Sequence, residues 1–173
     1  MEEAASLPLV ALTVWQVLVE RARLKAGQKI LIHAVRSLGA DVVIDYKTQD
    51  FSAMLSGYDV GINSLDAKTL EASLKVLKRG GHLISISGPP DPAFARAQGL
   101  NGVLRLVLRL ISAGIRRKAR RVGVDYSFLF MRADGDQLSK ITALIEAGTI
   151  RPVVDKVFPF NPLNEALAYI ETG

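Results

Sequence analysis

Short, continuous apolar runs constrain the fold of this chain more than any other feature of its sequence. Six such runs are present: Lys29–His33, Asp41–Tyr46, Tyr58–Asn63, Gly81–Ser87, Tyr126–Met131 and Val153–Phe158. Runs of this length that do not alternate apolar and polar residues are typical of strands buried on both faces. The sequence therefore predicts a sheet that is covered on both sides.

Helical patterns separate several of these runs. The predicted helices are Leu7–Arg23, Asp66–Leu77, Gln137–Ala147 and Leu163–Ile170. The first is apolar on nearly all sides, so we expect it to be largely buried. The basic residues and glycines of 78–81 are expected to close the second, and Asp134 to cap the third. Strands separated by helices predict an α/β fold with a parallel sheet, and the absence of a repeat or linker favours one domain over residues 1–173.

The composition excludes several kinds of chemistry. The chain has no cysteine, which rules out disulfides, thiolate metal sites and cysteine nucleophiles. Its only histidines, His33 and His82, lie in apolar strand patterns without paired ligands, so a structural role is expected for both and no metal site is predicted. The N-terminus starts with two acids and shows no cleavage signal, which predicts a cytoplasmic protein. The longest apolar stretch, Leu7–Val19, is too short and too interrupted to span a membrane.

The net charge of +5 comes from one segment. Arg105–Arg121 holds seven bases and no acid, and the rest of the chain has 15 bases against 17 acids. A surplus of positive charge confined to one segment is weak evidence for nucleic-acid binding, so no nucleic-acid partner is predicted. Arg105 and Arg109 recur four residues apart on an apolar helical pattern, which could also lie on an anionic membrane surface.

Four stretches carry a resemblance to a known family. They read SLPLVALTVWQVLVERARLKAGQKILIHA, RSLGADVVIDY, SLKVLKRGGHLISI and ALIEAGTIRPVVDKVFPFNPLNEALAYIETG. In this order they resemble the cofactor domain of medium-chain dehydrogenase/reductases, in the zinc-independent, quinone-oxidoreductase-like branch. The resemblance implies a doubly wound Rossmann-like fold that binds NADPH. It also implies hydride transfer to a quinone, enone or related carbonyl compound without a metal, and a homo-oligomer.

The chain departs from this family in one important place. Ala34 is joined directly to Val35, where the family has a glycine-rich turn, a helix and a strand, a crossover of roughly 30 residues. That turn holds the pyrophosphate of the cofactor. We therefore expect a sheet that lacks one strand and has an exposed edge, and impaired cofactor binding. We also expect the family's N-terminal substrate domain to be missing from this chain. A fragment or a degraded gene product would also explain the direct link. The alternative function is that of a non-catalytic remnant that acts by oligomerisation or through its basic helix on anionic surfaces.

The candidate cofactor-binding residues follow the predicted strands. Ligands of open α/β sheets bind at the carboxyl ends of the strands. The residues at these ends are Asn63, Ser64, Ser85, Ile86, Ser87 and Gly88. The other interpretation is ordinary capping by small polar residues, and Asn63-Ser64-Leu65-Asp66 lacks the glycine pair that the family has there.

Two more candidates rest on the resemblance. Phe128, Leu129 and Phe130 match the family segment whose backbone binds the nicotinamide carboxamide, although they would equally form an apolar strand. Thr13 matches a threonine near the cofactor, although a helical threonine often bonds the carbonyl of the preceding turn. No catalytic residue is assigned. The same resemblance gives the basic segment a third role, packing beside the substrate cleft and a partner subunit.

Overall fold

The computed structural model of the chain describes residues 6–33, 41–45, 48–154, 156–159 and 163–171. These residues fall into two compact units. One is Gln16–Phe130, and the other combines Met1–Trp15 with Met131–Gly173. Each unit is described by itself.

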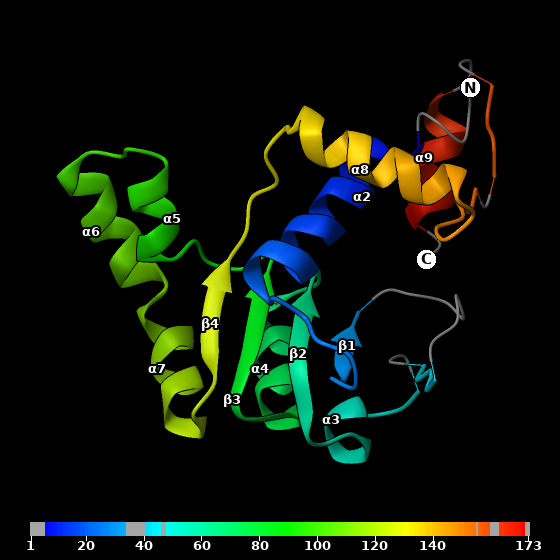
Figure 1. Cartoon of the computed structure of the whole chain (residues 1–173). Helices are drawn as coiled ribbons and strands as arrows, with labels where there is room; N and C mark the ends of the chain where they lie inside the picture. The colour runs from blue at the N-terminus through cyan, green and yellow to red at the C-terminus, as the bar shows by residue number, and fades with distance from the viewer. Residues whose placement is uncertain (1–5, 34–40, 46–47, 155, 160–162, 172–173) are drawn as a thin grey trace. The chain divides into compact units, whose positions relative to one another are not determined.

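The larger unit is built on a four-stranded sheet. Its strands are β1 (Ile30–Ile32), β2 (Tyr58–Asn63), β3 (Leu77–Ser85) and β4 (Asp125–Phe128). They lie side by side in the order β1-β2-β3-β4, and every neighbouring pair is parallel (Figure 1). The predicted parallel α/β fold is confirmed.

Helices connect these strands and begin at recognisable caps. The helical elements of this unit are η1 (Gln16–Arg21), α3 (Phe51–Met54), α4 (Ala67–Val76), α5 (Pro92–Ala97), α6 (Gly102–Ile111) and α7 (Ala113–Val122). Asp66, Asp91 and Asn101 each accept a hydrogen bond from a backbone N–H in the first turn of α4, α5 and α6. These bonds satisfy donors that a helix start otherwise leaves unpaired.

Both faces of the sheet are covered by apolar side chains. On one face Leu83 packs in a cluster with residues of α4 and α7, including Leu70 and Ile115. On the other face Ile84, the next residue of β3, packs with Val17 of η1 and with Val60. Successive residues of a strand point to opposite faces, so adjacent apolar residues serve two separate cores. This explains why the strand sequences show no alternation.

The smaller unit contains α2 (Pro8–Trp15), α8 (Gly135–Glu146) and α9 (Leu163–Glu171). Asp134 caps α8 by accepting a hydrogen bond from the N–H of Gln137, as predicted. The expectation that the first helix is largely buried is wrong here: only Leu12 of α2 is buried, whereas Leu9 and Val10 are more than 60% exposed. Within this unit α2 packs against α8, which covers one side of it.

Two predicted strands are not strands in the described residues. Val42 and Val43 of the predicted strand Asp41–Tyr46 are more than half exposed and pair with nothing, and Tyr46 lies outside the described residues. The chain between β1 and this run is too short for a crossover that would bring it back into the sheet. The described residues of Val153–Phe158 are also irregular, because the described part of their unit contains no strand to pair with.

Residues 78–81 also differ from the prediction, because they belong to β3 and do not close the preceding helix. Gly80 adopts a left-handed conformation with φ of 79°. A Cβ on Gly81 would lie 2.9 Å from the carbonyl oxygen of Asp59. The two glycines therefore form an irregular start of β3, where its register with β2 shifts.

The edge of the sheet at β1 is open in the described residues. There β1 pairs with β2 alone, and Ile32 is 45% exposed although it belongs to an apolar strand. This is the exposed edge expected from the direct link between Ala34 and Val35. An open edge of this kind can pair with another chain.

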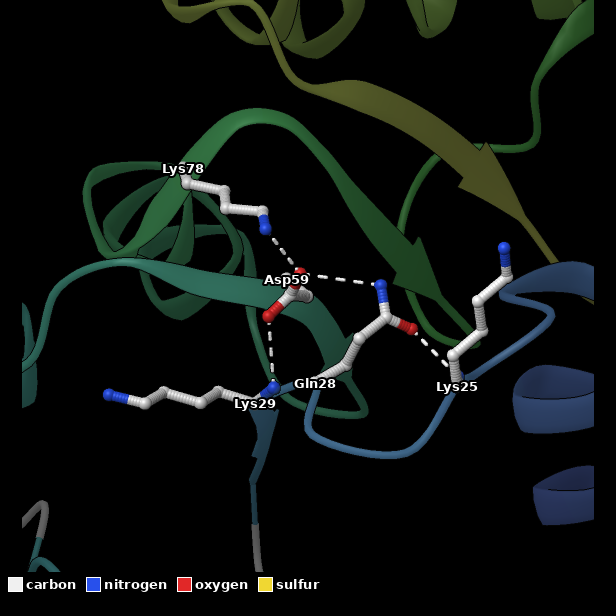
Figure 2. A network of polar contacts seen from close by, with 5 residues as sticks. All are labelled: Lys25, Gln28, Lys29, Asp59 and Lys78. Carbon is white, nitrogen blue, oxygen red and sulfur yellow. Dashed lines mark hydrogen bonds and ion pairs between the residues drawn. The ribbon is translucent and has the colours of Figure 1, made fainter.

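A polar network joins the amino ends of three strands (Figure 2). The Asp59 carboxylate accepts hydrogen bonds from the backbone N–H of Lys29 at 2.9 Å and from Gln28 at 3.3 Å. It also forms an ion pair of 2.5 Å with Lys78. The side-chain hydrogen bond from Lys78 and the backbone bond from Lys29 hold the pKa of Asp59 below its ordinary value.

We expect Asp59→Asn to remove part of the pH dependence of folding stability. Because the pKa of Asp59 is lowered in the folded state, its contribution is present above the ordinary carboxylate pKa and is lost as the pH falls below it. Unfolding by urea at pH 7 and at several pH values below 4.5 should show a weaker decline for the variant. The exposed Asp41→Asn is the control and should behave like the parent chain; an equal change in both variants would contradict the role of the network.

Candidate functional site

Most of the predicted site residues meet at the carboxyl edge of the sheet. Asn63 ends β2, Ser85 ends β3 and Phe128 ends β4, and the strand register pairs Asn63 with Ser85 and Ser85 with Phe128. Ser64, Ile86 and Ser87 follow directly. The carboxyl edge of a parallel sheet is where open α/β proteins bind ligands.

Three of these side chains form one polar cluster. The Asn63 side chain is fully buried, and its Oδ1 accepts hydrogen bonds from Ser85 and Ser87, each at 3.2 Å. The exposed Ser87 hydroxyl also lies 2.6 Å from the carbonyl oxygen of Leu65. The Ile86 side chain is different, because it packs on the apolar cluster of the sheet.

One atom of this cluster is left without a partner. The Nδ2 of Asn63 is the buried side-chain nitrogen for which no hydrogen-bond partner exists among the described residues. A buried donor that is not hydrogen-bonded costs about 1–3 kcal/mol. The polar cluster at the carboxyl edge is therefore incomplete among the described residues, which fits a site that receives a polar ligand group.

Gly88 has a packing reason to be glycine. A Cβ there would lie 2.7 Å from the Ser85 hydroxyl oxygen and 2.9 Å from the Tyr126 hydroxyl oxygen. Its N–H also donates to the Ser85 hydroxyl at 2.8 Å. Close approach of the chain to its own side chains thus accounts for this glycine.

Asp91 is a residue of this edge that the sequence analysis did not single out. Its side chain is buried, with one oxygen accepting from the N–H of Phe94 at 2.7 Å and the other from the N–H of Phe128 at 3.1 Å. It thereby caps α5 and fixes the end of β4. The pair Asp91-Pro92 is a recognisable helix start, which could have revealed the cap but not the contact with Phe128.

Tyr126 stands next to this carboxylate. Its hydroxyl donates a hydrogen bond of 2.7 Å to the carbonyl oxygen of Pro89. Burial raises the pKa of Tyr126 well above its ordinary value, and the negative charge of Asp91 raises it further. Tyr126 is therefore a neutral hydrogen-bond donor at physiological pH.

Two of the three backbone N–H groups of Phe128–Phe130 form hydrogen bonds within the chain. The N–H of Phe128 donates to Asp91, and the N–H of Leu129 donates to the carbonyl oxygen of Ser85 at 2.9 Å. The side chains of Phe128 and Leu129 are buried, whereas that of Phe130 is 69% exposed and lies against Phe94. Among the described residues, Phe130 is thus the one of the three whose N–H has no partner.

Thr13 belongs to the other compact unit, and its hydroxyl donates to the carbonyl oxygen of Leu9 at 2.7 Å. This is the bond to the preceding turn that the sequence analysis considered.

His33, just after β1, contacts the Ser73 hydroxyl through Nε2 at 2.8 Å and packs edge-on against Phe51. Burial lowers the pKa of His33.

The chain contains no cysteine, and in the described ranges no three His, Asp or Glu side chains lie close enough together to hold a metal ion. Nor does any helix in the described part of the chain have the length and apolarity to cross a membrane.

A doubly covered parallel sheet with polar groups at its carboxyl edge defines the class of Rossmann-like α/β domains. Within that class, the chain belongs to the zinc-binding dehydrogenase family, whose model matches residues 38–173. This confirms the predicted membership of the medium-chain dehydrogenase/reductase superfamily and the likeness to quinone oxidoreductases.

Individual relatives agree with this assignment. The chain is 29% identical over 211 residues to the mitochondrial NAD(P)H oxidoreductase RTN4IP1 of Bos taurus, covering 99% of this chain and 53% of the relative. It is 28% identical over 144 residues to the chloroplastic NADPH-dependent alkenal/one oxidoreductase of Arabidopsis thaliana, covering 82% and 28%. Among solved structures, the quinone oxidoreductase of Coxiella burnetii matches with a TM-score of 0.76 at 19% identity, covering 98% of this chain and 56% of that one.

The chain is shorter than the relatives it matches. It spans about half the length of the RTN4IP1 proteins it matches. The 211 aligned positions of the bovine protein, against 173 residues here, leave at least 38 positions with no counterpart in this chain. These positions are more than enough for one strand-helix crossover.

Proposed function

We propose that residues 1–173 form most of a single nicotinamide-cofactor domain from an NADPH-dependent oxidoreductase that transfers hydride to a quinone, enone or related carbonyl compound. The observation that carries the proposal is the polar carboxyl edge, where Asn63, Ser85 and Ser87 meet and one buried amide nitrogen lacks a partner. The family supports a dehydrogenase, and the names of two relatives specify NAD(P)H and NADPH.

The chain's own groups would orient the cofactor at this edge. Ser87 is exposed and can offer its hydroxyl. The resemblance assigns Phe128–Phe130 to the segment whose backbone binds the carboxamide, and Phe130 is the most exposed of the three. The neutral hydroxyl of Tyr126 and the buried Asp91 hold the backbone around them. The bound nicotinamide supplies the hydride; the protein positions it and shields it from water. Thr13 and Ser64 remain further candidates for cofactor contact.

The open edge at β1 favours a second candidate function. The chain could act as a non-catalytic remnant that oligomerises by pairing β1 with another copy, since this strand pairs on one side only in the described residues. The direct link between Ala34 and Val35 supports this alternative, because the phosphate-binding turn of the family is not present there. The homo-oligomer and the cytoplasmic location stay predictions; relatives include mitochondrial and chloroplastic proteins.

A cofactor titration tests the proposal. A ligand that binds only the folded chain raises the free energy of unfolding by RT ln(1 + [L]/Kd), about 2.7 kcal/mol when its concentration is 100 times Kd. We expect NADPH to raise the melting temperature. Concentrations of up to about 1 mM are used, because the missing turn weakens binding of the cofactor. The absence of any rise with NADPH and NADH would overturn the proposal and leave the non-catalytic alternative.

Matched serine variants locate the binding. Ser87→Ala should weaken the response to NADPH, because its hydroxyl belongs to the proposed site. Ser139→Ala is the control: Ser139 is an exposed serine on α8 whose hydroxyl likewise bonds a backbone carbonyl. Equal responses from the two variants would exclude Ser87 from the site.

A further inference from the structure

A basic hollow lies over α6 and α7, and none of its lining residues is a proposed cofactor contact. Its volume is about 420 Å³, within the range of small-molecule sites. Five of its seven lining residues are arginines: Arg109, Arg116, Arg117, Arg120 and Arg121. No lining residue is an acid.

These arginines are not neutralised within the described part of the chain. No ion pair to a carboxylate is found there for any of the five, whereas the neighbouring Lys118 pairs with Glu71 at 2.6 Å. Arg116 and Arg120, like Arg117 and Arg121, are four residues apart on α7 and repel each other. The sequence from 93 to 124 contains no acid that could offset this repulsion. The uncompensated charge is unfavourable for the free chain and favourable for an anionic ligand.

One of the five guanidinium groups is held in place. Arg116 is half-buried, and it donates from Nε to the Ser112 hydroxyl at 3.2 Å and from Nη2 to the carbonyl oxygen of Arg109 at 2.9 Å. Ser112 is itself fully buried and bonded to the carbonyl oxygen of Leu108. A guanidinium fixed in this way loses little conformational freedom when it binds an anion.

A second hollow of about 380 Å³ adjoins the first and shares Arg109 and Arg116 with it. It adds Arg96 and reaches Asp91. The carboxylate of Asp91 is the acid in its lining, and both of its oxygens already accept backbone N–H groups. The two hollows thus form a continuous basic surface with room for more than one anionic group.

We propose that this pair of hollows is a binding site for the phosphate groups of a small polyanion, such as a pyrophosphate or a phosphate ester. Planar guanidinium groups match phosphate oxygens in bidentate geometry, and several arginines on one concave surface suit a multiply charged ligand. The proposal does not rest on the proposed cofactor function, because its arginines are not among the proposed cofactor contacts and binding needs no hydride transfer. The residue common to both sites is Asp91, whose carboxylate oxygens already accept backbone N–H groups.

The geometry favours a free polyanion over a lipid surface. Val103 and Val107 of α6 are exposed, and at 100° per residue they lie on the opposite side of the helix from Arg105 and Arg109. If this apolar face of α6 lay in a bilayer, Arg109 would lie on the headgroup side, so α6 by itself also suits an anionic membrane surface. The other four arginines of the hollow belong to α7, whose apolar residues Ile115 and Ala119 are buried in the core cluster and leave no apolar face for a bilayer. No aromatic residue interleaves the bases, as single-stranded nucleic acid would require.

The test is a calorimetric titration of the full chain with inorganic pyrophosphate at constant ionic strength. We expect saturable binding that is at least about tenfold weaker in Arg117→Gln/Arg121→Gln, since each charge-assisted hydrogen bond contributes at least this much. Because this variant removes like-charge repulsion, it should stay folded, which circular dichroism checks. Arg105→Gln/Lys140→Gln removes the same charge outside both hollows and should bind within about twofold of the parent chain.

Three outcomes would overturn the proposal. Equal weakening in both double variants would mean that net charge alone attracts pyrophosphate. Binding to vesicles containing phosphatidylglycerol, with no binding of soluble pyrophosphate, would assign the arginines to a membrane surface. Binding of a single-stranded oligonucleotide with no binding of pyrophosphate would assign them to nucleic acid.

Discussion

Replacing Asp91 by alanine is expected to lower the free energy of unfolding by about 1.5–5 kcal/mol, because one side chain satisfies two backbone donors. Loss of the cap on α5 contributes about 0.5–2 kcal/mol. The N–H of Phe128, in the interior at the end of β4, loses its acceptor as well, and an unpaired buried donor costs about 1–3 kcal/mol. Urea unfolding followed by circular dichroism measures the sum.

The control for Asp91 is a helix cap without a second contact. Asn101→Ala removes the cap of α6, where the side chain accepts from the N–H of Leu104 at 2.9 Å in an exposed position. Its effect should be about 1 kcal/mol. If Asp91→Ala costs no more than this, the contact between Asp91 and Phe128 contributes nothing and the end of β4 is held by other groups. A larger cost should come with a weaker response to NADPH, because Phe130, a proposed cofactor contact, lies two residues after Phe128.

The strands that the sequence predicts correctly are those that find a partner in the sheet. The strands β1 and β2 pair with each other, and apolar side chains of both pack in the cluster on one face of the sheet. Val42 and Val43 have the same local composition but no neighbouring strand, so they stay exposed. An apolar run predicts a strand only where the chain between runs is long enough to return to the sheet.

Tertiary pairing also overrides a strong local signal at the start of β3. Lys78-Arg79-Gly80-Gly81 has the bases and glycines of a helix end, yet Leu77 pairs with Tyr58 and the strand begins there. The ion pair between Lys78 and Asp59 joins the same two strands. These contacts link residues about 20 positions apart, which no local pattern of the sequence specifies.

The candidate site was predictable where it depends on strand ends. Asn63, Ser85 and Phe128 end three neighbouring strands, so the parallel sheet brings them together. The role of Asp91 was not predictable, because its bond to Phe128 spans 37 residues. The basic segment was evident in the sequence, but the hollow that collects its arginines depends on how α7 follows α6 at Ser112.

Replacing Leu83 by alanine is expected to cost about 2–5 kcal/mol of folding free energy, since it removes a fully buried side chain and leaves a cavity. Leu83 lies at the centre of the cluster that joins β3 to Leu70 of α4 and Ile115 of α7. The rigid sheet cannot close such a space. The control is Leu106→Ala on α6, where 55% of the residue is exposed and a change within about 0.5 kcal/mol is expected. Thermal and urea unfolding compare the two variants. If Leu83→Ala costs no more than Leu106→Ala, then α4 and α7 do not pack on this face of the sheet, and the doubly covered fold on which the site depends is wrong.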